Sequence, residues 1–228
     1  MKWTFLIHGV SGTGKSTRVY YLREMLRSAQ QPHPFIYNGM CLGEYFPFVD
    51  LIILGKEINR KGTKTWQGID AIFRKLKTAE HAFRLFAEWG VDHNLVVESA
   101  FLLTTSRATP LKLQALTPGE VGWASLVYLY NSEEEYASRI RARSGSLKNS
   151  EAPNFKHNNL LQFQGSRVQK ELEMIGPTHR PHEVLTKMYD SPVESLAEYV
   201  FEKLGLSLFN VSKPFFYKPI FQKGRPLF

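Results

Sequence analysis

Gly9-Val10-Ser11-Gly12-Thr13-Gly14-Lys15-Ser16 is the stretch that decides the fold of this chain. It follows the short apolar run Trp3-Thr4-Phe5-Leu6-Ile7 and precedes residues 17–26, whose apolar side chains recur at helical spacing. This order predicts a strand, a glycine-rich turn and a helix. Backbone N–H groups in such a turn, together with the start of the helix, can wrap a row of phosphates.

The turn and the first helical positions are expected to bind ATP. Lys15 is expected to reach the β- and γ-phosphates as a catalytic residue, and the Ser16 hydroxyl is expected to ligate Mg²⁺. Thr17 either contacts the α-phosphate or continues the helix. The alternative is a turn that only joins a strand to a helix. The predicted ATP-binding residues of this segment are Gly9, Gly12, Thr13, Gly14, Lys15, Ser16 and Thr17.

Further along the chain, apolar runs of strand length alternate with segments of helical periodicity. This alternation predicts an α/β protein with a P-loop NTPase fold, in which helices flank a mostly parallel sheet. The expected strands cover residues 35–37, 51–54, 94–98, 124–130 and 183–188, and the expected helices cover residues 67–77, 78–89 (ended by Gly90), 133–143 and 193–204.

The chain is expected to form one kinase domain over residues 1–205, with a lid at about 133–160. Residues 206–228 form a separate tail that interleaves aromatic and basic side chains and contains no acid. Its prolines disfavour a helix. The tail is expected to cover the core or to contact a second copy, with nucleic-acid contact as the alternative.

Composition indicates which partners, cross-links and metal sites to expect. Lys and Arg number 29 against 21 Asp and Glu, which gives a net charge of +8 and a pI near 9.5 and indicates anionic partners. Cys41 is the single cysteine, so no internal disulfide is expected, and the histidines lack metal-ligand spacing. We find no long apolar run and no signal peptide, so we expect a cytoplasmic protein without membrane contact.

Two acids are candidates for the acceptor side of a phosphoryl transfer. Glu98 ends the apolar strand at residues 94–97, where a carboxylate can hold the Mg²⁺ water shell or accept a proton from an acceptor hydroxyl. Asp70 stands near the expected start of a helix, where an acid also favours the helix dipole without catalytic duty. Both acids are predicted catalytic residues, and Glu98 is a predicted metal ligand.

Three arginines lie on or near the expected helix that follows the strand at 124–130. Arg139 and Arg143 share a helical face, and Arg141 lies between them. Arginines at this place can neutralise the charge that develops on a transferred phosphoryl group. We predict that Arg139 and Arg143 are catalytic and that Arg141 binds the nucleotide; a solvated helix face is the alternative.

The segment from residue 56 to residue 66 is basic and ends in an aromatic residue. Such a loop can follow a nucleic-acid backbone while the aromatic ring stacks on a base. The alternative is a solvated loop with its tryptophan in the core. The predicted substrate-binding residues are Lys56, Arg60, Lys61, Lys64 and Trp66.

The P-loop, the pair Glu98-Ser99 and the arginine-bearing helix together resemble the nucleoside and nucleotide kinases. Within that group, Leu54-Gly55-Lys56 followed by Trp66-x-Gly68-x-Asp70 resembles the phage enzymes that phosphorylate 5-hydroxymethyl-deoxyuridine within DNA, a step in thymine hypermodification. The resemblance covers residues 1–205, and nothing after Gly205 matches it.

The resemblance implies ATP with Mg²⁺ as the donor and the 5-hydroxymethyl group of a modified thymine base in DNA as the acceptor. It also implies that the protein is located in host cytoplasm, if a phage encodes the chain. Asp70 and Glu98 would lie near the acceptor hydroxyl, and a base flipped from the duplex would stack on Trp66. Two other functions stay open at this point: a deoxynucleoside monophosphate kinase acting on free nucleotides, and a nucleotide-binding regulatory protein. The sequence does not indicate an oligomeric state.

Overall fold

The computed structural model describes residues 2–9, 13–60, 63–69, 78–99, 122–130, 132, 134, 138, 185–189 and 191–206. The strands in these ranges are β1 (Lys2–His8), β2 (His33–Tyr37), β3 (Met40–Phe46), β4 (Leu51–Leu54), β5 (Lys56–Arg60), β6 (Thr63–Gln67), β7 (Asn94–Glu98), β8 (Gly122–Tyr130) and β9 (Leu185–Tyr189). The α-helices are α1 (Lys15–Ala29), α2 (Ala79–Asp92) and α6 (Ser195–Lys203), and a short 3₁₀ helix covers Pro47–Val49.

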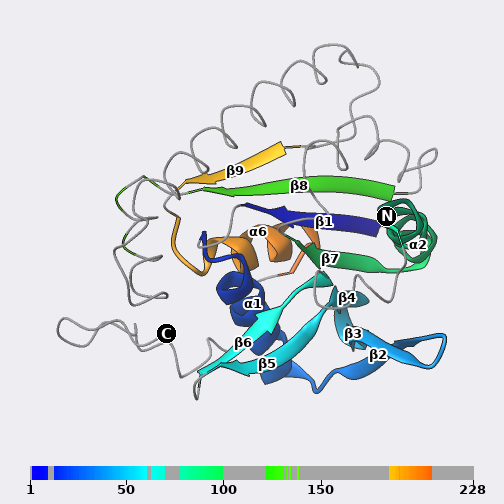
Figure 1. Ribbon diagram of the computed structural model, residues 1–228. Coiled ribbons are helices and arrows are strands. Elements are labelled where there is room, and N and C mark those ends of the chain that lie inside the picture. Colours follow the sequence, from blue (N-terminus) through cyan, green and yellow to red (C-terminus); the bar gives the residue numbers. More distant parts are fainter. Residues whose placement is uncertain are drawn as a thin grey trace, which may run out of the picture.

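The main sheet has seven strands in the order β2-β3-β4-β7-β1-β8-β9 (Figure 1). Strands β4, β7, β1, β8 and β9 are mutually parallel, while β2 and β3 pair antiparallel at one edge. The expected α/β fold with a mostly parallel sheet is therefore confirmed. Because β1 lies between β7 and β8, the carboxyl ends of all three strands meet at one edge of the sheet.

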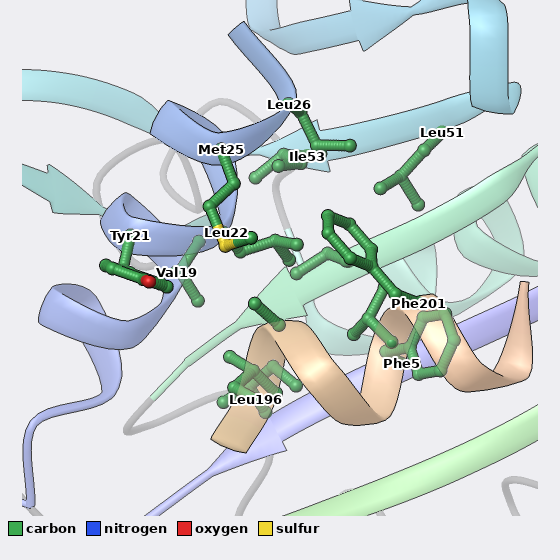
Figure 2. Close-up of a cluster of buried hydrophobic side chains, with 14 of the residues drawn as sticks. Phe5, Val19, Tyr21, Leu22, Met25, Leu26, Leu51, Ile53, Leu196 and Phe201 are labelled. Carbon is green, nitrogen blue, oxygen red and sulfur yellow. The ribbon is translucent and has the colours of Figure 1, made fainter. Parts of the chain in front are cut away.

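Successive residues of β1 face opposite sides of the sheet, as the pleat of a strand requires. Phe5 packs in a core with α1 and α6, whereas Leu6 packs in a second core with α2. Figure 2 shows the first core, with side chains of α1 such as Leu22 directed toward Phe201 of α6. Full burial of a side chain of this size contributes roughly 1.5–3 kcal/mol, so this packing holds the middle of α1 against the sheet and α6.

The structure differs from the sequence-based expectations at several elements. Strand β3 is not among the expected strands, because glycine within a run, here Gly43, disfavours a strand. Helix α2 begins after its cap Thr78 as expected but continues through Gly90 to Asp92. Gln67 ends strand β6 instead of starting a helix, and residues 70–77 of that expected helix lie outside the described residues.

The expected lid and tail lie almost entirely outside the described residues. Only Glu134 and Ser138 of the lid, both in helical conformation, and Leu206 of the tail are described. Within the described part of the chain, none of the helices has the length and apolarity needed to cross a membrane.

Candidate functional site

The glycines of the phosphate-binding turn occupy positions where a side chain does not fit. Gly9 follows β1 directly, and a Cβ there would lie 2.5 Å from the backbone oxygen of Leu129 and 2.6 Å from Oγ1 of Thr13. Gly14 precedes α1 in the left-handed conformation, with φ of 83°, which glycine adopts without strain. These two residues let the chain turn sharply from the end of the strand into the helix.

The start of α1 suits an anion. Gly14 offers no side chain to cap the helix, and the first turn contains no acidic residue. The N–H groups and the positive end of the helix dipole are therefore not engaged by a carboxylate of the first turn. Lys15 is 5% exposed, and its Nζ donates a hydrogen bond of 2.7 Å to the backbone oxygen of Gly9, so its ammonium group lies over the turn. Ser16 is half-buried and Thr17 is exposed.

Arg18 holds the turn from the side of α1. One of its terminal nitrogens donates to the backbone oxygen of Thr13 at 3.0 Å. The other donates to the backbone oxygen of Ser191 and, at 3.3 Å, to its Oγ. Arg18 thereby joins the phosphate-binding turn to the segment between β9 and α6. We did not predict this role from the sequence, where Arg18 reads as one more basic residue of an amphipathic helix.

Glu98 lies at the same edge of the sheet as the turn. It ends β7 opposite Ile7 of β1, and the N–H of Ser99 donates to the backbone oxygen of Ile7 at 3.2 Å. The Glu98 side chain is 5% exposed. A crevice outside the carboxyl ends of parallel strands is the usual ligand site of such sheets, so a carboxylate here is well placed for chemistry.

Gly68 holds the Glu98 carboxylate. Its backbone N–H donates a hydrogen bond of 2.9 Å to Oε2 of Glu98. A Cβ at Gly68 would lie 2.1 Å from the backbone oxygen of Glu98 and 2.3 Å from Oε2, so only glycine fits. The structure thus brings Gly68 of the Trp66-x-Gly68-x-Asp70 pattern to Glu98. Asp70 itself lies outside the described residues.

In the two halves of the short pattern, Leu54 and Gly55 pack against Trp66 and Gly68. Nε1 of Trp66 donates to the backbone oxygen of Leu54 at 3.2 Å. Gly55 has φ of 130°, and a Cβ there would lie 2.6 Å from Nε1 of Trp66 and 2.9 Å from Cα of Gly68. Leu54, Gly55, Trp66 and Gly68 therefore form one packed unit beside Glu98, which we call the acceptor-side unit.

Residues 56–60 and 63–67 pair as the antiparallel hairpin β5–β6, where a loop was expected. Trp66 is 1% exposed, so its ring lies in the core and is not available to stack on a base. This corrects the base-stacking expectation and agrees with the alternative that placed the ring in the core. Lys56 and Lys64 are exposed, and Arg60 ends β5. Lys61 lies outside the described residues.

A buried arginine ties this hairpin to α1. The Arg23 side chain is 3% exposed and binds Glu44 through Nε at 2.6 Å and Nη2 at 2.7 Å. It also contacts Glu57 of β5 at 2.7 Å and lies 5.4 Å from the centre of a Trp66 ring. We call this group the Arg23 network; its members are Arg23, Arg27, Lys64, Glu24, Glu44 and Glu57.

The charges of the Arg23 network compensate one another. Burial alone would raise the pKa of Glu57, but the charge of Arg23 and hydrogen bonds from Arg23 and Lys64 outweigh it and hold that pKa below its ordinary range. Glu57 is therefore ionised at neutral pH. The sequence weakly indicates that Arg23 is buried, because it lies among apolar residues on the inner face of α1.

The remaining predicted site residues cannot be placed. Gly12, Arg139, Arg141 and Arg143 lie outside the described residues. Among the parts of the chain that the structure describes, no three His, Cys, Asp or Glu side chains gather into a metal site. Mg²⁺ that is held mainly by phosphates and water needs no such cluster.

Comparison with known proteins places the chain in a family. The sequence model of the family described as 5-hmdU DNA kinase 2 matches residues 1–181. A 5-hmdU DNA kinase 2 from Salmonella phage ViI is 31% identical over 147 residues, which are 61% of this chain and 48% of that protein. This chain thus spans about half the length of that relative.

Two solved structures of kinases show low similarity to this chain. A sugar kinase from Janibacter sp. HTCC2649 superposes with a TM-score of 0.44 at 15% identity, over 93% of this chain and 99% of that one. A shikimate kinase from Acinetobacter baumannii gives a TM-score of 0.41 at 17% identity, over 88% and 92%. The family match rests instead on the sequence model over residues 1–181, and on that ground the chain belongs to the 5-hmdU DNA kinase 2 family.

Proposed function

We propose that this protein is an ATP-dependent kinase that transfers the γ-phosphate to the 5-hydroxymethyl group of 5-hydroxymethyl-deoxyuridine in DNA, a step in thymine hypermodification. One observation carries the proposal. The phosphate-binding turn and the carboxylate of Glu98 lie at one edge of the sheet, and Gly68 joins that carboxylate to the Trp66-x-Gly68-x-Asp70 segment. Family membership over residues 1–181 supports the same substrate.

On the donor side, the turn and the first residues of α1 would hold ATP. A helix start without a capping side chain or a first-turn acid suits the phosphates. Lys15 would exchange its hydrogen bond with the oxygen of Gly9 for the β- and γ-phosphates. Ser16 and Glu98 are the residues that would hold Mg²⁺, which when bound supplies positive charge to the transferred phosphoryl group.

On the acceptor side, Asp70 or Glu98 would take the proton from the 5-hydroxymethyl group. The hydroxyl oxygen then forms a bond to the γ-phosphorus, the bond between that phosphorus and the bridging oxygen breaks, and ADP leaves. Glu98 is fixed by Gly68 before substrate arrives, which reduces the reorganisation needed for proton transfer. We propose that Arg139, Arg141 and Arg143 close over the phosphates as a lid.

A DNA substrate agrees with the basic character of the chain. Lys56 and Lys64 are exposed on hairpin β5–β6, Arg60 ends β5, and Lys61 follows Arg60 in the sequence. These four residues would follow the DNA backbone next to the acceptor side of the site. A base inside a duplex cannot reach this edge of the sheet, so the target base would be presented from single-stranded or opened DNA. If a phage encodes the chain, the reaction takes place in host cytoplasm.

The proposal is tested by offering ATP labelled at the γ-phosphate together with one of three acceptors: free deoxynucleotides, plain DNA, or DNA that contains 5-hydroxymethyluracil. We expect label only in the modified DNA, and none with the Lys15→Ala variant. Label in free deoxynucleotides would indicate a deoxynucleoside monophosphate kinase. Nucleotide binding with no labelled acceptor would indicate a regulatory protein.

A further inference from the structure

Arg23 occupies a position on α1 that joins the donor side to the acceptor side of the site. Lys15 begins α1 at the phosphate-binding turn, and Arg23 follows two helical turns later on the same rigid element. Arg23 is buried against the hairpin, with its guanidinium carbon 5.4 Å from the centre of a Trp66 ring. The helix that holds the phosphates therefore also contacts the acceptor-side unit.

Contacts on other sides also fix the Trp66 ring. Its Nε1 donates to the backbone oxygen of Leu54, and Gly55 packs closely against the same nitrogen. Gly68 stands two residues after Trp66 and holds the carboxylate of Glu98. A displacement of the ring would move the backbone at Gly68, because Gly55 lies against both Trp66 and Gly68 and leaves no space for independent movement.

A buried arginine that binds three glutamates is not explained by stability alone. Taking these charges out of water costs free energy that the ion pairs often only offset, and apolar residues of similar size frequently serve as well. The planar guanidinium, however, binds the Glu44 carboxylate through two nitrogens and stacks on an aromatic ring at the same time. A lysine cannot reproduce this geometry.

We propose that Arg23 is a positioning residue for the acceptor side: through the ring of Trp66 it fixes the backbone of Gly68, and thereby the carboxylate of Glu98. The inference rests on the proposed function for its effect on turnover. Its structural part, the dependence of the bond between Gly68 and Glu98 on Arg23, holds for any activity at this site.

Arg27 provides a matched control on the same helix. It lies one turn beyond Arg23 and contacts Glu24 and Glu57 of the same network, at 3.6 and 3.7 Å. Its side chain is 31% exposed, and its ion pairs join it to neither Glu44 nor the acceptor-side residues. Arg27→Lys keeps the charge at a neighbouring site of the network and leaves the stack on Trp66 intact.

The test compares Arg23→Lys, Trp66→Phe and Arg27→Lys with the unsubstituted protein. The first readout is hydrogen exchange of the Gly68 amide measured by NMR, with the amide of Leu6 in the centre of β1 as reference. We expect Arg23→Lys and Trp66→Phe each to speed Gly68 exchange by about tenfold relative to Leu6, as a local opening of the acceptor-side unit requires. Arg27→Lys should leave the ratio of the Gly68 exchange rate to the Leu6 exchange rate unchanged.

The second readout is turnover on DNA that contains 5-hydroxymethyluracil. We expect Arg23→Lys and Trp66→Phe to lower kcat about tenfold or more, with the KM for ATP within about twofold, because misplacing a catalytic group costs rate without loss of donor binding. If Arg23→Lys does not fold, the Gly68 exchange rate and the kcat of Trp66→Phe test the proposal.

The inference is overturned if Gly68 exchange is the same in all four proteins, or if Arg27→Lys behaves like Arg23→Lys. These outcomes differ from a failure of the proposed function, in which the unsubstituted protein phosphorylates no modified DNA. In that case the exchange readout alone still tests whether Arg23 fixes Gly68.

Discussion

The backbone N–H of Gly68 donates a hydrogen bond of 2.9 Å to Oε2 of Glu98, and the two residues approach so closely that no side chain fits at position 68. This contact joins two segments that lie 30 residues apart in the sequence. It also gives the glycine of the Trp66-x-Gly68-x-Asp70 pattern a physical reason, since the backbone must reach the buried carboxylate directly.

Substitution of Gly68 by alanine is expected to displace Glu98. The added Cβ would lie 2.1 Å from the backbone oxygen of Glu98, so the main chain has to shift. We expect a loss of about 1–3 kcal/mol in the free energy of unfolding, as is usual for overpacking, and a fall in kcat of about tenfold or more. Urea unfolding and steady-state kinetics measure the two effects.

Gly39→Ala is the control for Gly68→Ala. Gly39 lies in the turn between β2 and β3 with φ of 74°, and among the described residues no atom beyond Gly39 and its two chain neighbours lies within 4 Å of an added Cβ. This variant also loses stability, because alanine is strained at that φ, but it should keep its kcat. Equal losses of kcat in both variants would contradict a specific role for the contact with Glu98.

Amide substitutions test which acid acts as the general base. Glu98→Gln retains an oxygen that can accept from the N–H of Gly68, so the geometry is kept while the charge and proton-accepting capacity are lost. We expect kcat to fall by about 10²–10⁴-fold for the residue that acts as base. Asp70→Asn is measured in parallel, and either residue is excluded as the base if its amide variant turns over at the full rate.

The exposed lysines of hairpin β5–β6 are expected to differ in their effect on DNA binding. Lys64 is 63% exposed but lies 3.4 Å from Glu57, whose carboxylate compensates part of its charge. Lys56 is exposed at the start of the hairpin, beside Gly55. We expect Lys56→Ala to weaken DNA binding and to reduce the slope of log K against log salt by about 1, with a smaller effect for Lys64→Ala.

The measurement is a salt titration of DNA binding for both lysine variants, with the KM for ATP as the control. If Lys56→Ala changes neither the affinity for DNA nor its salt dependence, the hairpin does not follow the DNA backbone.

Asp50 should make stability depend on acid pH. Its Oδ1 accepts from the Tyr45 hydroxyl at 3.1 Å and contacts Nδ1 of His93 at 2.6 Å, and its Oδ2 accepts from Lys2. Burial alone would raise the pKa of Asp50, but these hydrogen bonds and the charge of Lys2 lower it below the ordinary 3.8. The stability that Asp50 contributes is therefore present above pH 3.8 and is lost as the pH falls through the lower pKa of the folded state.

Asp50→Asn isolates this contribution. Asn tolerates the left-handed φ of 47° at this position, so the backbone is not strained by the change. We expect the variant to be about 1–3 kcal/mol less stable near neutral pH, with the difference narrowing in acid. Urea unfolding of both proteins from neutral pH to below pH 3.8 measures this difference in stability. A difference that stays constant over that range would contradict the role given to the Asp50 carboxylate.

The parallel core and the phosphate-binding turn could be predicted from the sequence because local signals determine them. The apolar runs at β1, β4 and β7 and the glycines before Lys15 each carry their own periodicity or turn chemistry. The position of Glu98 followed from the same logic, since an acid at the end of a buried strand lies at the edge where the turn is also found. These features needed no knowledge of distant contacts.

The errors arose where a distant contact decides the local structure. Gly43 resembles a break in the sequence, yet it lies within β3, where a side chain would collide with the backbone oxygen of Ile53. Gly90 resembles a helix end, yet α2 continues through it, and a Cβ there would approach Oγ1 of Thr4 to 3.0 Å. At both positions a distant contact accounts for the glycine. Residues 56–66 resemble a basic loop in the sequence, whereas contacts of the buried Arg23 with Glu57 and Trp66 hold them as part of a hairpin.

The most direct test of the central claim is the location of the phosphate on the product. DNA that contains 5-hydroxymethyluracil is incubated with ATP and the protein and then digested to nucleosides, and the coupling of phosphorus to neighbouring protons is measured by NMR. We predict that phosphorus couples to the methylene protons of the 5-hydroxymethyl group. Phosphate found only on a sugar hydroxyl, or only on free nucleotides, would contradict the account.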